Sequence, residues 1–246
     1  MINCQLVSPN GHALKKIDEW LTPAFPDWFK DLPSTRYKFN AERQNFNTNV
    51  KGCPSFVRLF KNSYLLRAPE DVMITSPGSE SGGKVMFASE ASNAPPFQTV
   101  LSADMGAEMH PSFAETHANL QFGFNFVLIP ETPIEMVYLD PCYHLDKKSE
   151  LTAMTGMLLL HPEMYMSINV NMLLPFTAFN DKNETFIKKG QPLAYLFFPG
   201  GRPKIEPHKI TMSEWSEDYG YRRETFQGHW ISEMGRLEAE ERQADL

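Results

Sequence analysis

The chain has 246 residues, of which 42% are hydrophobic and 22% charged, and its formal net charge is −7. These values are those of a folded protein and exclude a disordered chain, and the acidic balance argues against a protein that coats nucleic-acid duplexes. No apolar run approaches the roughly 18 residues of a membrane span, and the N-terminus lacks the regions of a signal peptide. We therefore expect a protein of the cytoplasm, or of a virus particle assembled there, with neither a membrane nor nucleic acid as partner.

Residues 1–50 predict an extended lead-in and one short helix. The helix is indicated by apolar residues at helical spacing, Leu14, Ile17 and Leu21, with Trp20 beside them. Asn10 is placed to cap this helix, and Pro23 ends it. A compact aromatic segment at 28–33 and a polar surface loop at 34–50 follow.

Residues 51–200 predict a β-rich core domain. Pro54 suits the first turn of a helix that carries Phe56, Leu59, Phe60 and Tyr64 on one face. At least seven strands follow at short spacing, among them a hairpin: 71–76, 84–89, 122–128, 134–139, 154–160, 166–172 and 193–198. No helical pattern separates these strands, so the fold class is mainly β (α+β), either an antiparallel sandwich or a partly closed β-barrel.

Two of these strands have the clearest patterns. In the first, Met166, Ile168, Val170 and Met172 alternate with Ser167, Asn169 and Asn171, which places the apolar set on one face. Residues 193–198, which follow a turn signal at 189–192, are apolar on both faces. They predict a central strand that is covered on both sides.

Residues 201–246 predict an aromatic tail that ends in a C-terminal helix. Large aromatic residues are costly to expose. We therefore expect four of them to pack against the core or against a partner chain: Trp215, Tyr219, Tyr221 and Trp230.

An ordered set of short segments spans residues 28–200. The segments are Trp-Phe-Lys-Asp-Leu-Pro at 28–33; Lys-Gly-Cys-Pro-Ser-Phe at 51–56, leading to Tyr64 and Asp71; His110-Pro111; Tyr165, with Asn169 or Asn171, and Pro175-Phe176; and 190–199. In this order they resemble an uncharacterised family of tailed-phage proteins, found especially in large, myovirus-like phages of marine bacteria. The resemblance implies a phage or phage-derived setting and brings no reaction with it.

The chain departs from that family's pattern in its middle. The family's Asn-Pro-Trp and Asp-Thr-Asp runs are missing, and residues 128–130 and 161–163 occupy the corresponding places. Any chemistry carried by the acidic residues of that pattern is therefore in doubt for this member.

A shorter segment, 186–196, is similar to the closing strand of dUTP pyrophosphatase and dCTP deaminase proteins. In those families a glycine-containing turn leads into a strand, as Gly190 does here. This resemblance implies a β-clip scaffold, whereas an ordinary turn followed by a buried strand explains the same residues.

Glu108, His110 and His117 form the best candidate for a metal site. Two histidines and a carboxylate on adjacent strands bind Fe²⁺ or Mn²⁺ in cupin-type sites. Here six residues separate the two histidines and Pro111 interrupts any strand between them, so a surface loop is the competing interpretation.

Three further groups are candidates for chemistry. His144, between Asp140 and Asp146, is a candidate general base with a raised pKa, or one residue of a charged loop. The polar face of strand 166–172 is the second group, with Ser167, Asn169 and Asn171. If this face is covered, its polar groups need hydrogen-bond partners, which a bound ligand would supply; if it faces water, they are ordinary surface residues. The three cysteines have neither disulfide nor zinc spacing, so we expect reduced and mostly buried thiols: Cys4, Cys53 and Cys142.

Two hypotheses about function follow. The first is a phage-associated structural or accessory protein, such as a virion component, that acts without catalysis or cofactor through contacts with copies of itself or with virion proteins. The alternative is a small-molecule or nucleotide enzyme on a β-clip or cupin-like scaffold, dependent on a divalent metal. Convergence of Asp104, Glu108, His110 and His117 in one pocket would favour the enzyme.

Overall fold

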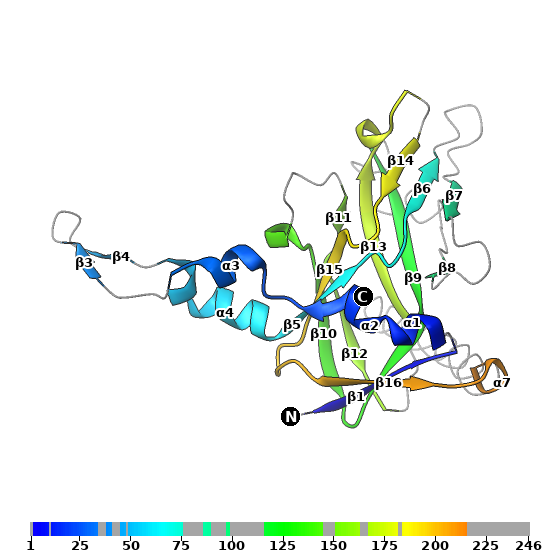
Figure 1. Cartoon of the computed structure of the whole chain (residues 1–246), viewed down its shortest axis with the longest axis horizontal. Helices are drawn as coiled ribbons and strands as arrows, with labels where there is room; N and C mark the ends of the chain where they lie inside the picture. The colour runs from blue at the N-terminus through cyan, green and yellow to red at the C-terminus, as the bar shows by residue number, and fades with distance from the viewer. Residues whose placement is uncertain are drawn as a thin grey trace, which may run out of the picture.

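The computed structural model describes residues 2–9, 11–33, 38–40, 45–47, 49–75, 86–89, 97–98, 116–144, 151–162, 167–181 and 184–215. Over these residues the protein is mainly β, with short helices, as the sequence predicts (Figure 1).

Two large sheets make up the body. The first has the strand order β11-β13-β9-β1-β16, with β8 paired to β9. Its strands are β11 (Thr152–Ala153), β13 (Ser167–Pro175), β9 (His117–Pro130), β1 (Asn3–Ser8), β16 (Lys204–Lys209) and β8 (Phe97–Gln98). The β1–β16 pair is parallel and the other pairs are antiparallel.

The second sheet is antiparallel throughout, with the order β12-β10-β15-β5-β2. Its strands are β12 (Gly156–Leu160), β10 (Ile134–Leu139), β15 (Pro192–Phe197), β5 (Ser63–Arg67) and β2 (Leu21–Pro23). The two sheets thus take in β1, β2 and β16, which lie outside residues 51–200.

The inner faces of the two sheets share one hydrophobic core, which makes the fold a sandwich. From the first sheet β9 contributes Phe124 and Phe126, whose rings lie 6.3 and 5.1 Å from that of Trp20. From the second sheet, Met136 and Leu196 are fully buried in the same core. In the described part of the chain no sheet closes on itself.

The patterns of β13 and β15 are confirmed. Along β13 the apolar residues Ile168, Val170 and Met172 are buried, as their alternation with polar residues predicts. β15 has hydrogen-bonded neighbours on both sides and is buried from Leu193 to Leu196. The turn before it requires Gly190, whose φ of 81° lies in the region that favours glycine.

Two smaller sheets complete the strands. β14 (Glu184–Ile187), β6 (Val72–Thr75) and β7 (Met86–Ser89) form a sheet in which β6 and β7 pair as the predicted hairpin. β3 (Lys38–Asn40) pairs with β4 (Asn45–Asn47) where a polar loop is predicted. This second pair projects beyond the body in Figure 1.

The N-terminal helix differs from the prediction. Two short helices, α1 (Gly11–Lys15) and α2 (Ile17–Trp20), replace one, and Leu21 belongs to β2 instead. The reason is tertiary, because Leu21 pairs with Leu66 in the second sheet and is buried there.

Short helices follow at several places: α3 (Asp27–Asp31), η1 (Val50–Gly52), α4 (Pro54–Lys61), η3 (Cys142–His144), η4 (Phe176–Ala178) and α7 (Met212–Glu214). The predicted start of α4 at Pro54 is confirmed. Tyr64, however, lies in β5 and not on that helix, because the helix ends at Lys61 with Asn62 as its C-cap.

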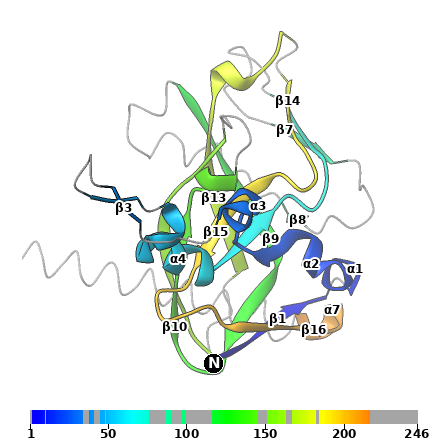
Figure 2. The same cartoon turned by 60° about the vertical axis from the view of Figure 1, so that its left-hand side comes forward.

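Helices α3 and α4 pack on the outer face of the second sheet, against Leu65 of β5 and Tyr195 of β15 (Figure 2). They do so through an aromatic cluster: Phe25, Trp28, Phe29, Phe56, Phe60, Tyr143 and Tyr195. Phe60 at its centre is completely buried. On the same sheet, the outward-facing Met157 and Leu159 of β12 are exposed, and no described helix packs on them.

Of the four aromatic residues predicted to anchor the tail, only Trp215 lies in the described residues. It is half-buried and packs against a small cluster of Val7, Val127 and Ile210. Tyr219, Tyr221 and Trp230, and the predicted C-terminal helix, lie outside the described residues.

Candidate functional site

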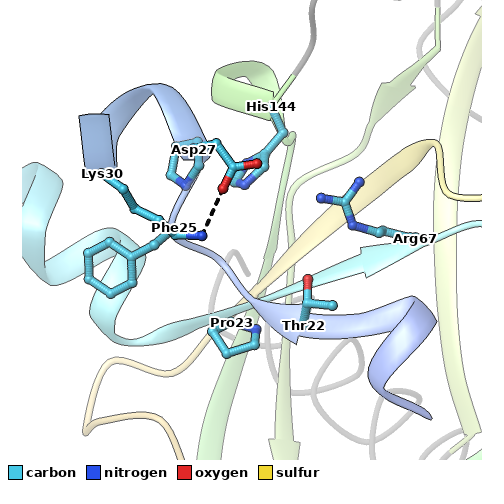
Figure 3. Close-up of a pocket in the computed structure, with 8 residues that line it drawn as sticks. Thr22, Pro23, Phe25, Asp27, Lys30, Arg67 and His144 are labelled. Carbon is cyan, nitrogen blue, oxygen red and sulfur yellow. Dashed lines mark hydrogen bonds and ion pairs between the residues drawn. The ribbon is translucent and has the colours of Figure 1, made fainter. Parts of the chain in front are cut away.

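A cleft of about 660 Å³ lies where the chain passes from β2 into α3 (Figure 3). Residues from three separate segments line it: Thr22, Pro23, Phe25, Pro26, Asp27 and Lys30 from β2 to α3, Arg67 from β5, and His144 from η3. Pro26, with φ −68° and ψ 150°, holds the chain extended before α3 begins. The cleft therefore lies between the end of the sheet and the first turn of the helix.

Arg67 is the half-buried cation of the cleft. Its Nη1 donates a hydrogen bond to the carbonyl oxygen of Gly190 at 2.8 Å. Burial lowers the pKa of its guanidinium, and Asp27 opposes that effect. Within the described ranges no ion pair involves Arg67. Its remaining N–H donors are therefore available to a ligand.

His144 lies beside Arg67 and is half-buried. Its Nδ1 is 2.7 Å from the hydroxyl oxygen of the buried Tyr195. Burial lowers the pKa of His144 to about 4, and the positive charge of Arg67 acts in the same direction. The imidazole is therefore neutral near pH 7.

The raised pKa predicted for His144 as a general base is wrong. Its pKa is lowered and not raised, because burial and Arg67 both disfavour the imidazolium ion. Asp140 instead accepts a hydrogen bond from the backbone N–H of Ala153 at 3.1 Å, and Asp146 lies outside the described residues.

Asp27 and Lys30 lie at the mouth of the cleft as an exposed ion pair, with Oδ1 and Nζ 2.8 Å apart. Hydrogen bonding and charge from Lys30 lower the pKa of Asp27. The next residue, Trp28, donates from Nε1 to the carbonyl oxygen of Tyr143 at 2.7 Å, which joins α3 to η3. This bond fixes the position of His144 relative to Asp27.

The predicted metal site is not tested by the structure. Glu108 and His110, with Asp104, lie outside the described residues, whereas His117 begins β9 with its Nδ1 2.7 Å from Thr116 Oγ1. Among the described residues no three metal-ligating side chains come together. A divalent metal thus stays a prediction for this chain.

Ser167, Asn169 and Asn171 belong to β13, in the first sheet, and none of them lines the cleft. Asn169 and Asn171 are half-buried, and Oδ1 of Asn171 is buried with no hydrogen-bond partner among the described residues. Their role in ligand binding stays a prediction.

The cysteines are unpaired, as expected, but not mostly buried. Only Cys4 is buried, and burial raises its pKa to about 12. Cys53 is half-buried and Cys142 is exposed.

No helix in the described ranges is long and apolar enough to cross a membrane.

Sequence reasoning picked out His144 but missed the rest of the cleft. Thr22 and Arg67 carry no local signal, because only the pairing of β2 with β5 brings them together. Asp27 and Lys30 have the spacing of a helical ion pair, which indicates a surface helix and not a site.

Comparison with known proteins gives no relative. No family model, no curated protein and no solved structure matches the chain. The phage-family and closing-strand resemblances therefore stay predictions.

Proposed function

We propose that this protein acts without catalysis, as a phage-associated structural or accessory protein that associates with other copies of itself. The observation that carries the proposal is β12, an edge strand among the described strands, where Met157 is 68% and Leu159 is 53% exposed. Exposed apolar side chains beside an open sheet edge are typical of a surface that pairs with another chain.

β12 differs from the other edges of the two large sheets. Soluble proteins usually protect sheet edges by shortness, proline or charge. Here β2 has three residues and ends in proline, β11 has two residues, and β16 carries Lys204, Glu206, Pro207 and Lys209. The sequence of β12, Gly-Met-Leu-Leu-Leu, has five residues and none of these features.

The strand is complementary to itself. Antiparallel pairing of two copies centred on Leu158 sets Met157 of each opposite Leu159 of the other, with all four side chains on one face. β12 has no charged residue, so the paired strands place no like charges opposite each other. The net charge of −7 on each chain acts against association only from outside the strand. The result is a two-fold interface that continues the second sheet across both protomers.

The phage setting of the proposal is supported by the ordered segments between residues 28 and 200. In the structure, hydrogen bonds join several of these segments. Lys51 Nζ donates to the carbonyl oxygen of Lys30, at 2.8 Å, and to that of Leu32. Asp71 Oδ1 accepts a hydrogen bond from the N–H of Lys189, beside the segment 190–199, at 2.7 Å. These contacts organise turns and helix ends, which fits a role without catalysis. Mass spectrometry of purified particles of a phage that encodes the chain tests the setting.

Self-association is tested by Met157→Lys. We expect the wild-type protein to sediment as a dimer at micromolar concentration and the variant as a monomer, because the substitution places a charge at the centre of the interface. Met212→Lys is the matched control, since Met212 is 67% exposed and lies away from β12. A monomeric wild type, or equal effects of the two substitutions, would contradict the proposal.

A further inference from the structure

The cleft beside α3 has an excess of positive charge in an acidic protein. Arg67 and Lys30 contribute two positive charges and Asp27 one negative charge, while His144 is neutral, which leaves a net charge of +1. The whole chain carries −7. Lys30 is already paired with Asp27, so the charge without a partner among the described residues is that of Arg67.

The donors in the cleft suit an oxyanion. One N–H of Arg67 is used by Gly190, and the planar guanidinium keeps others for a carboxylate or phosphate. Donation from the Tyr195 hydroxyl to His144 Nδ1, 2.7 Å away, selects one tautomer of the neutral ring. This tautomer keeps the proton of His144 on Nε2, which makes the neutral ring a donor too.

Part of the lining of the cleft is apolar. Pro23, Phe25 and Pro26 form this part, and Figure 3 shows Thr22, Arg67, His144 and Asp27 around the same space. A volume of about 660 Å³ lies within the range of roughly 300–1,000 Å³ that small-molecule pockets occupy. The cleft can therefore hold an organic molecule as well as its charged group.

We propose that this cleft binds a small organic anion, with its carboxylate or phosphate group on Arg67 and its apolar part against Pro23 and Phe25. Binding needs no chemistry from the protein. It is independent of self-association, because β2 and β12 are opposite edges of the second sheet, about 19 Å apart at the usual strand spacing.

Calorimetry with the full chain tests this, using benzoate, inorganic phosphate and phenyl phosphate, with neutral benzamide as control. We expect benzoate or phenyl phosphate to bind saturably and benzamide not to bind. Binding of benzoate assigns a carboxylate, and binding of phenyl phosphate or inorganic phosphate assigns a phosphate. Absence of saturable binding by all three anions, or equal binding of benzamide, would overturn the proposal.

Two variants and a matched control locate the site. Arg67→Gln should weaken binding by about ten-fold or more, because it removes a charged donor. Arg58→Gln should change nothing, since Arg58 also donates to a carbonyl oxygen, that of Pro199 at 3.1 Å, but lies outside the cleft. Equal losses in both variants would contradict the site.

Asp27→Asn separates an effect on binding from an effect on folding, because a variant that unfolds can only lose affinity. Removing this negative charge should tighten anion binding about three-fold, a gain that no loss of folding can produce. Addition of the anion should also shift the imidazole NMR signals of His144 and raise its pKa, because the anion stabilises the imidazolium ion. Unchanged affinity in Asp27→Asn together with unmoved His144 signals would rule out this cleft as the binding site.

Discussion

His144 is held neutral by two features that act together. Its ring is half-buried against the Tyr195 hydroxyl, and the guanidinium of Arg67 is close enough to disfavour a second positive charge. Asp27, the one acidic group of the cleft lining, opposes the lowering of the pKa but does not overcome it. The ring therefore stays a neutral hydrogen-bonding group at a pH where an exposed histidine is already charged.

This arrangement predicts a dependence of stability on pH. The folded pKa of about 4 lies below the ordinary 6.5, so between these values the unfolded chain binds a proton that the folded chain does not. The free energy of unfolding should fall by about 1–3 kcal/mol as the pH drops from 6.5 to 4, and this contribution is fully present above 6.5. Urea denaturation across this range measures it.

The control for this experiment is a comparison of two variants. His144→Gln should lose this part of the pH dependence, because glutamine does not titrate. His208→Gln, at an exposed position on β16, should keep the wild-type curve. An NMR titration that places the pKa of His144 at 6.5 or above would contradict the account.

At the residue scale, the sequence shows which side chains carry chemistry but not which of them meet. His144 stands out in the sequence between two aspartates, yet its effective neighbours are Arg67, Asp27 and Tyr195, which lie far from it along the chain. Periodicity and spacing describe local structure only. The lowered pKa of His144 was therefore beyond sequence reasoning.

Among the elements, α3 and α4 owe their positions to the aromatic cluster. Phe60 lies at its centre, with ring centroids 5.1 Å from Phe29 and 5.8 Å from Tyr143. Each helix is too short to be stable on its own, since isolated helices below about 12 residues are marginal in water. Packing on β5 and β15 must therefore supply most of their stability.

Phe60→Ala should lower the free energy of unfolding by about 3–5 kcal/mol, because it leaves a large cavity under both helices. Phe176→Ala should cost under about 0.5 kcal/mol, since that side chain is 44% exposed. Thermal or urea denaturation of the two variants provides the comparison. Similar losses in both would show that the cluster does not hold the helices in place.

Elements with a strong local pattern were predictable, and those that depend on distant pairing were not. β9, β13 and β15 show alternating or continuous apolar residues, and the structure confirms them. β16 is mostly polar and contains a proline, so its strand depends on β1, from the other end of the described chain, which pairs with it. Leu21 fits a helix locally, yet pairing with β5 makes it a strand residue.

For the whole molecule, the anion-binding cleft and the self-association surface lie at the two ends of one sheet, the second sheet. The outer face of this sheet is covered by α3 and α4 at one end, where the cleft lies, and no described helix packs on it at the other end, at β12. The mainly β class was predictable from the number and spacing of the strands, which left a sandwich and a partly closed barrel as alternatives. The part of the outer face that the helices cover was not, because nothing in the local sequence shows where α3 and α4 pack.

The central claim is that β12 pairs with β12 of a second copy. Hydrogen–deuterium exchange of the wild-type protein at low and high concentration tests it most directly, because alternate β12 amides point away from β10 and no other described strand pairs with them. We predict that amides within Gly156–Leu160 exchange more slowly at high concentration, while those of the equally exposed Met212 region do not change. Identical exchange of β12 at both concentrations, with a dimer present at the higher one, would contradict the claim.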